Sequence, residues 1–91
     1  MSLPEILVVD DDAELRELIE AYLSKQGYRV RSAADGIEMD AELARARPQL
    51  VILDLMLPGE DGLSIAKRLK AEQGIPIIML SAQGEDVDRI V

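Results

Sequence analysis

Three short apolar runs in this chain each end at a residue with an oxygen-bearing side chain. Ile6–Val9 is followed by three aspartates, Leu50–Leu53 by Asp54, and Ile77–Leu80 by Ser81. Aliphatic runs of this length are typical of strands that are buried on both faces of a parallel sheet. Because ligands bind beyond the carboxyl ends of such strands, these side chains are expected to converge at one site.

The segments between these runs have the apolar period of amphipathic helices. The first helix is expected to begin after Asp12, which would cap it, and to end at Gly27. Its apolar stripe would consist of Leu15, Leu18, Ile19, Tyr22 and Leu23. A second helix is expected over residues 37–47, before a proline, and a third is expected to end near Gly74.

A further strand, Tyr28–Ala33, alternates apolar and charged residues and is therefore expected at an edge of the sheet. Strands and helices then alternate along the chain, which predicts one domain with an open, doubly wound parallel α/β sheet. The last residues, Glu85–Val91, have the pattern of the first turns of a fourth helix.

Composition excludes several classes of function. The chain has no cysteine and no histidine, which excludes thiolate nucleophiles, histidine metal ligands and a phosphohistidine within these residues. Its net charge of −8 argues against direct binding of nucleic acid. No apolar run approaches the roughly 18 residues that cross a bilayer, and no secretory signal is present. These features predict a cytoplasmic protein that does not bind a membrane.

The aspartates at 10–12 have two interpretations. They could form a helix N-terminus, where a carboxylate caps free N–H groups and faces the positive end of the dipole. One cap, however, does not need three adjacent carboxylates, whose mutual repulsion raises the cost of ionisation. A hard cation removes that cost, and Mg²⁺ accepts one or two carboxylates together with waters and phosphate oxygens. These residues alone leave both interpretations open.

Asp54 follows four aliphatic residues, so burial would penalise its charge unless a partner is present. It precedes Leu-Met-Leu-Pro rather than a helix, which leaves no obvious helix for it to cap, although a role in a turn stays open. A carboxylate beside a metal is a suitable nucleophile for forming an acyl phosphate. Ser81 would place a hydroxyl at the end of the neighbouring strand, where it can donate to a phosphoryl oxygen.

The remaining glycines and arginines do not indicate a second site. The glycines lack the spacing of a phosphate-cradling loop, so no nucleotide site is expected. The arginines at 29, 31, 45 and 47 are expected to be solvated surface charges rather than a phosphate clamp.

Three motifs resemble, in the same order, those of the receiver domains of bacterial two-component response regulators. They are Leu-Val-Val-Asp-Asp at 7–11, Leu-Val-Ile-Leu-Asp-Leu-Met-Leu-Pro-Gly-Glu-Asp-Gly at 50–62 and Ile-Pro-Ile-Ile-Met-Leu-Ser-Ala at 75–82. The resemblance extends from Ile6 to Val91 and implies a sheet with the strand order 2-1-3-4. The Leu-Met-Leu-Pro form resembles the subgroup that carries DNA-binding output domains.

The resemblance implies a role for each residue of the site. Asp54 would be the phosphoacceptor. Asp10 and Asp11 would hold Mg²⁺ together with Asp54 and the backbone carbonyl of Met56. Asp12 matches no ligand of the family, which favours its role as a helix cap.

The resemblance also implies partners and a switch. The phosphoryl group would come from the phosphohistidine of a sensor kinase, and an output domain outside these residues would respond to it. Ser81 would be the switch hydroxyl that turns toward the phosphoryl group, beside the amide of Ala82. Such a domain is a phosphoacceptor that is slowly dephosphorylated, not an enzyme with an external substrate.

The 91 residues depart from the family in one respect, because they contain neither its fifth strand, with an invariant lysine, nor its fifth helix. Residues 1–91 would then be a receiver domain that is incomplete at its C-terminus, with an exposed fourth strand and one uncovered face beside the first helix. A chain that ends at Val91 is therefore expected to self-associate. A truncated or engineered α/β fragment that self-associates without signalling remains an alternative. A phosphatase-type enzyme is disfavoured, since Met56 stands where its second aspartate would be.

Overall fold

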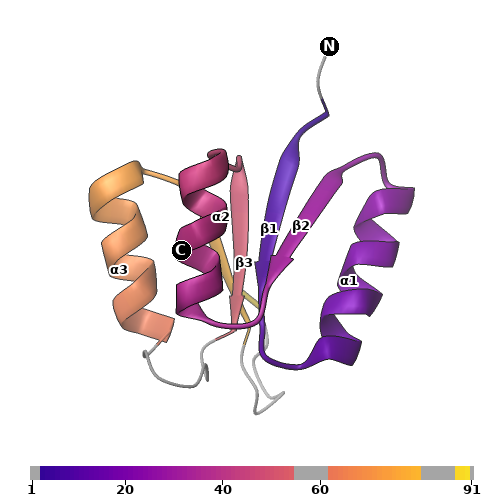
Figure 1. The fold of residues 1–91 in the computed structure, drawn as a ribbon, viewed down its shortest axis with the longest axis horizontal. Helices are drawn as coiled ribbons and strands as arrows, with labels where there is room; N and C mark the ends of the chain where they lie inside the picture. The colour runs from indigo at the N-terminus through magenta and orange to yellow at the C-terminus, as the bar shows by residue number, and fades with distance from the viewer. Residues whose placement is uncertain (1–2, 55–61, 81–87, 91) are drawn as a thin grey trace.

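The computed structural model describes residues 3–54, 62–80 and 88–90, the last three by their backbone. Within these ranges the parallel strands are β1 (Glu5–Val9), β2 (Arg29–Ala33), β3 (Leu50–Asp54) and β4 (Ile77–Leu80). Their spatial order is β2-β1-β3-β4, and each neighbouring pair is parallel (Figure 1). The predicted doubly wound α/β sheet with the order 2-1-3-4 is confirmed.

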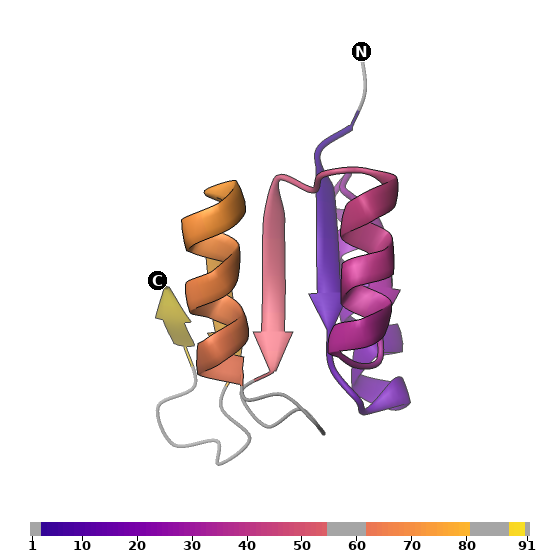
Figure 2. The same ribbon diagram turned by 60° about the vertical axis from the view of Figure 1, so that its left-hand side comes forward.

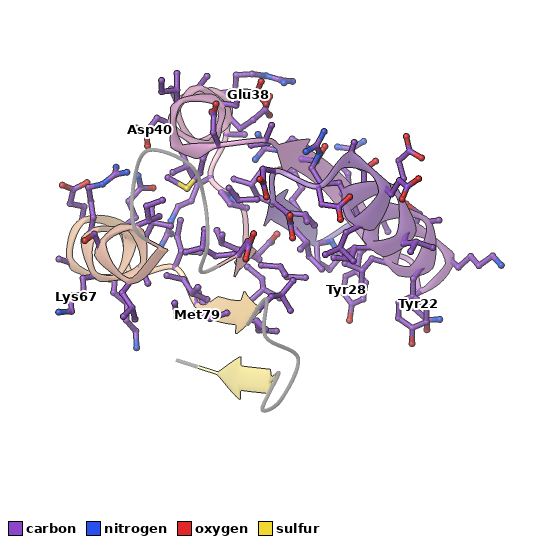
Figure 3. The ribbon with its side chains drawn as sticks, turned by 90° about the horizontal axis from the view of Figure 1, so that it is seen from below. Tyr22, Tyr28, Glu38, Asp40, Lys67 and Met79 are labelled. Carbon is purple, nitrogen blue, oxygen red and sulfur yellow. The ribbon has the colours of Figure 1, made fainter. Side chains whose placement is uncertain are left out.

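The helices are α1 (Ala13–Lys25), α2 (Gly36–Arg45) and α3 (Gly62–Gln73). α2 and α3 lie on one side of the sheet and α1 lies on the other (Figures 2 and 3). Asp12 caps α1 as predicted, because its Oδ1 accepts from the backbone N–H groups of Glu14 and Leu15. Gly27 and Gly74 follow α1 and α3 with φ of 95° and 64°, a conformation that favours glycine at helix ends.

The expectation for the last residues of the chain was wrong. Asp88–Ile90 forms a short strand, β5, that pairs antiparallel with β4, where a helix was expected. The pairing satisfies backbone groups of β4 that an exposed edge would leave to solvent, and a short isolated helix is only marginally stable. β4 is therefore not an edge, and this correction removes the pairing of exposed fourth strands as a route to self-association.

The core fills the space between the sheet and the pair α2 and α3. Alternate residues of β1, β3 and β4 point to this side, as the period of a strand requires. The members of this core cluster are Leu7, Val9, Ala33, Met39, Val51, Leu53, Ile65, Ala66, Leu69, Ile75, Ile77 and Met79. Each is at most 5% exposed, so this side of the domain is fully packed.

The opposite side of the sheet is only partly covered. α1 has no buried residue, and its Leu18 and Tyr22 are 68% and 63% exposed although they belong to the predicted apolar stripe. An apolar groove of about 460 Å³ runs between α1 and the strands, lined by Leu18, Ile19, Tyr22, Leu23, Ile52, Ile78 and Leu80. Tyr22 points toward this uncovered side (Figure 3). The uncovered face predicted beside the first helix is confirmed for the described residues.

Arg31 is a second correction, because it is not a solvated surface charge. Its side chain is 13% exposed and donates to the carbonyl oxygens of Glu42 and Ala46 and to the carboxylate of Glu42. It also lies 3.3 Å from the carboxylate of Glu5 on β1. Arg31 thus joins β1, β2 and the last turn of α2, where a cation faces the negative end of the helix dipole. Arg29 and Arg45 are exposed, as expected.

None of the helices in the described ranges is both long enough and apolar enough to cross a lipid bilayer.

We predict that Arg31→Met destabilises the protein by about 1–3 kcal/mol, because it removes charged hydrogen bonds to the part-buried carbonyl and carboxylate of Glu42 and to the Ala46 carbonyl. Chemical denaturation at neutral pH measures the effect. Arg29→Met is the matched control, since the Arg29 side chain is 63% exposed and lies 3.8 Å from Glu5. Equal losses of stability in the two variants would contradict the bridging role of Arg31.

The same contact predicts a pH dependence. Hydrogen bonds from Arg31 hold the pKa of Glu42 below its ordinary value of 4.5. The ionised carboxylate therefore stabilises the fold above pH 4.5 and stops doing so as the pH falls through the lowered pKa. The destabilisation caused by Glu42→Gln should accordingly shrink on acidification into that range, whereas a constant difference from wild type would contradict the ion pair.

We predict that the 91-residue chain, expressed by itself, self-associates through the groove, because water is released from its apolar wall. Replacing Leu18 and Tyr22 by glutamine should shift sedimentation toward the monomer. Ile37→Gln is the matched control, since Ile37 is 82% exposed on α2 and does not line the groove. A wild-type chain that is a cooperatively folded monomer at micromolar concentration would contradict this prediction.

Candidate metal centre

Three carboxylates meet at the carboxyl edge of the sheet. Asp10 and Asp11 directly follow β1, and Asp54 is the last residue of β3. The strands are parallel, with Val9 paired to Leu53, so Asp10 and Asp54 end neighbouring strands at the same height. One oxygen from each of the three carboxylates lies within 4.8 Å of the others. Figure 3 looks onto this end of the strands. The convergence predicted from the strand ends is confirmed for these residues.

Asp10 and Asp54 are buried, with exposures of 3% and 7%, while Asp11 is exposed. Burial raises the pKa of Asp10, and the charges of Asp54, Asp11 and Asp12 raise it further, against a lowering by the hydrogen bond from the Asp12 amide. Ionisation of Asp10 is thus less favourable in the folded protein than in an unfolded chain. A cation at this position would reverse the balance, because it offsets both the desolvation and the repulsion.

Asp10 is held by hydrogen bonds to each of its polar groups. Its amide donates to the Ala33 carbonyl on β2 at 3.1 Å, and its Oδ1 accepts from the Asp12 amide at 2.9 Å. Its carbonyl oxygen accepts from the guanidinium of Arg16, on α1, at 2.6 Å. These contacts fix the turn between β1 and α1. They also separate the two interpretations of the aspartate run, because Asp12 caps the helix while Asp10 and Asp11 face Asp54.

The donor set fits a hard cation. Carboxylate oxygens are the ligands that Mg²⁺ prefers, and Mg²⁺ usually keeps several waters instead of filling its shell from the protein. The exposed Asp11 leaves one side of the cluster open to water, while the buried pair Asp10 and Asp54 fixes the other side. An ion held there would supply positive charge next to Asp54 and to any anion that approaches it.

Three residues of the expected site lie outside the described residues: Met56, Ser81 and Ala82. β4 ends at Leu80, which pairs with Asp54, so the described part of the chain stops beside the carboxylates.

Sequence reasoning missed Arg16. The available signal was a cation close to the N-terminus of a helix, where the dipole disfavours positive charge unless another contact compensates.

Comparison with known proteins gives a family and close relatives. Residues 6–91 match the family model of the response regulator receiver domain. The chain is 45% identical over 89 residues to the transcriptional regulatory protein GltR of Pseudomonas aeruginosa, and 41% identical over 86 residues to ResD of Bacillus subtilis. Each alignment covers 94% of this chain but only 37% and 36% of the relative. The chain therefore spans little more than a third of the length of these proteins.

Solved structures give the same fold. The BeF3-activated N-terminal receiver domain of Klebsiella pneumoniae RstA superposes with a TM-score of 0.82 at 38% identity, covering 90% of this chain and 70% of that one. The response regulator TrrA of Thermotoga maritima, in complex with Mg(2+)-BeF, has a TM-score of 0.82 at 36% identity, covering 88% and 70%.

We predict that Mg²⁺ binding depends on Asp11 but not on Asp12. Asp11→Ala removes a carboxylate of the cluster and should weaken binding strongly, whereas Asp12→Ala removes a helix cap and should cost about 1 kcal/mol of stability. Calorimetric titration measures the affinities. In addition, Mg²⁺ at 100 times its Kd should stabilise the wild-type protein by about 2.7 kcal/mol. Equal loss of affinity in the two variants would contradict the assignment.

Proposed function

Because the chain belongs to the family of response regulator receiver domains, we propose that Asp54 accepts a phosphoryl group in a reaction that requires Mg²⁺. The observation that carries the proposal is the meeting of the Asp10, Asp11 and Asp54 carboxylates at one edge of the sheet. The relatives RstA, which is BeF3-activated, and TrrA, in complex with Mg(2+)-BeF, support the same chemistry.

In the proposed reaction a carboxylate oxygen of Asp54 attacks the phosphorus of the donor. A P–O bond forms to the carboxylate as the P–N bond to the donor histidine breaks, and the electron pair of that bond stays on the imidazole nitrogen, which then takes up a proton. Asp10 and Asp11 would hold Mg²⁺, which offsets the negative charge of the phosphoryl oxygens and the carboxylates. Catalysis would therefore be mostly positioning and charge neutralisation.

Three further roles belong to the proposal. The Met56 carbonyl would be a protein ligand of the cation, and the hydroxyl of Ser81 and the amide of Ala82 would donate to the phosphoryl oxygens. All three follow within two residues of the end of β3 or β4, inside the region that matches the family model. The domain would thus act as a phosphoacceptor and a switch, without turning over an external substrate.

The partners follow from the reaction and from the relatives. The 91 residues contain no histidine, so the phosphoryl group would come from outside them. We propose that its donor is the phosphohistidine of a sensor histidine kinase and that the transfer takes place in the cytoplasm. GltR and ResD are named transcriptional regulatory proteins and are much longer than this chain. We propose that residues 1–91 form the greater part of the receiver domain of such a regulator and that a separate domain binds DNA, consistent with the net charge of −8 here.

A second candidate is a fragment that self-associates through its apolar groove and does not signal. The exposed groove beside α1 favours it. The two candidates differ in chemistry, because only the first requires that Asp54 takes up a phosphoryl group.

We predict that acetyl phosphate with Mg²⁺ adds one phosphoryl group to the full-length protein and that Asp54→Asn abolishes this addition. The asparagine amide keeps the shape of the side chain but is a far weaker nucleophile than the carboxylate. Intact mass measures the adduct, and removal of Mg²⁺ with a chelator should also prevent it. Asp12→Asn is the matched control, because asparagine caps a helix as well as aspartate does. An adduct that persists in Asp54→Asn would place the acceptor elsewhere.

A further inference from the structure

Arg16 donates a hydrogen bond to the backbone of Asp10, although Arg16 is not itself a candidate metal ligand. Its guanidinium nitrogen Nη1 lies 2.6 Å from the main-chain oxygen of Asp10. Arg16 stands in the first turns of α1, so the contact spans the turn that connects β1 to the helix. A charged donor makes a stronger hydrogen bond than a neutral one, and the contact is partly buried.

The accepting carbonyl belongs to the peptide unit that joins Asp10 to Asp11. That unit is planar, so fixing the direction of its oxygen also fixes the directions in which the chain leaves toward both residues. The Asp10 amide and carboxylate are already held by Ala33 and Asp12. The guanidinium supplies the remaining restraint on the peptide, and with it on the relative placement of two carboxylates of the cluster.

We propose that Arg16 is a positioning residue of the metal centre, which holds the Asp10–Asp11 peptide in the orientation that lets both carboxylates face Asp54. This inference rests on the proposed function, because it assigns Arg16 a task in the same site. It acts through Asp10 and does not require contact between Arg16 and the cation or the phosphoryl group.

The direction in which Mg²⁺ affinity changes when Arg16 is neutralised distinguishes a positioning role from a purely electrostatic one. A positive side chain near a cation site repels the cation, so removing only its charge should strengthen Mg²⁺ binding. Removing a restraint on the ligands should weaken it, since residues that orient metal ligands typically change affinity by about 10- to 100-fold. Positioning and charge therefore predict opposite changes when Arg16 is neutralised.

The experiment compares Arg16→Gln, Arg16→Lys and Arg45→Gln in the full-length protein by calorimetric titration with MgCl2 at constant ionic strength. Arg45→Gln is the matched control, because it removes the same charge from an exposed position on α2. We expect Arg16→Gln to weaken Mg²⁺ binding by about 10-fold and Arg45→Gln to leave it close to wild type. Arg16→Lys should fall between, because an ammonium lacks the planar fork of the guanidinium.

A second readout needs no metal. In the protein without Mg²⁺, amide hydrogen exchange at Asp11 and Asp12 should be faster in Arg16→Gln than in wild type, since the turn between β1 and α1 loses a restraint. Unchanged or stronger Mg²⁺ binding by Arg16→Gln would overturn the proposal. If that variant does not fold, Arg16→Lys decides, since wild-type affinity in it would likewise overturn the proposal. Loss of phosphorylation is tested separately by Asp54→Asn, so the two proposals can fail independently.

Discussion

The parallel register between β1 and β3 is the constraint on which the site depends. Val9 pairs with Leu53, and both belong to the core between the sheet and α2 and α3. A slip of one residue would turn every side chain of a strand to the opposite face, so burial of this core fixes the register. The residues that follow these two positions, Asp10 and Asp54, are thereby brought to the same edge. Packing of an aliphatic core thus determines where the carboxylates meet.

The same arrangement makes the site unfavourable without a cation. Burial and neighbouring negative charges raise the pKa of Asp10, which means that its ionised form costs free energy in the folded protein. A repulsive site of this kind persists because the free energy gained by packing the surrounding core exceeds the free energy lost by bringing the carboxylates together. Ion binding then couples directly to stability. Asp10 needs only small adjustments on binding, because its amide and carbonyl are held by Ala33 and Arg16 and its carboxylate is held by the Asp12 amide.

Much of the fold and of the described site could be predicted from the sequence, because both depend on local patterns. Aliphatic runs predicted the strands, and the aspartates at the strand ends predicted the carboxylate cluster. The contacts of Arg31 could not be predicted, since they join β2 to β1 and α2, whose distance in space depends on the finished sheet. The contact of Arg16 is local, six residues from Asp10, but a cation in the first turn of a helix does not by itself identify its acceptor. β5 was missed because three residues have little conformational preference of their own, and pairing with β4 decides their structure. Met56, Ser81 and Ala82 remain predictions.

We infer that one cation binds to three carboxylates at the carboxyl edge of this sheet. A crystal structure of the full-length protein grown with Mg²⁺ and beryllofluoride tests it most directly. We expect a six-coordinate ion bonded to oxygens of Asp10, Asp11 and Asp54 at roughly 2.0–2.1 Å, with the beryllofluoride on Asp54. An ion bound elsewhere, or a beryllofluoride adduct on another residue, would contradict it.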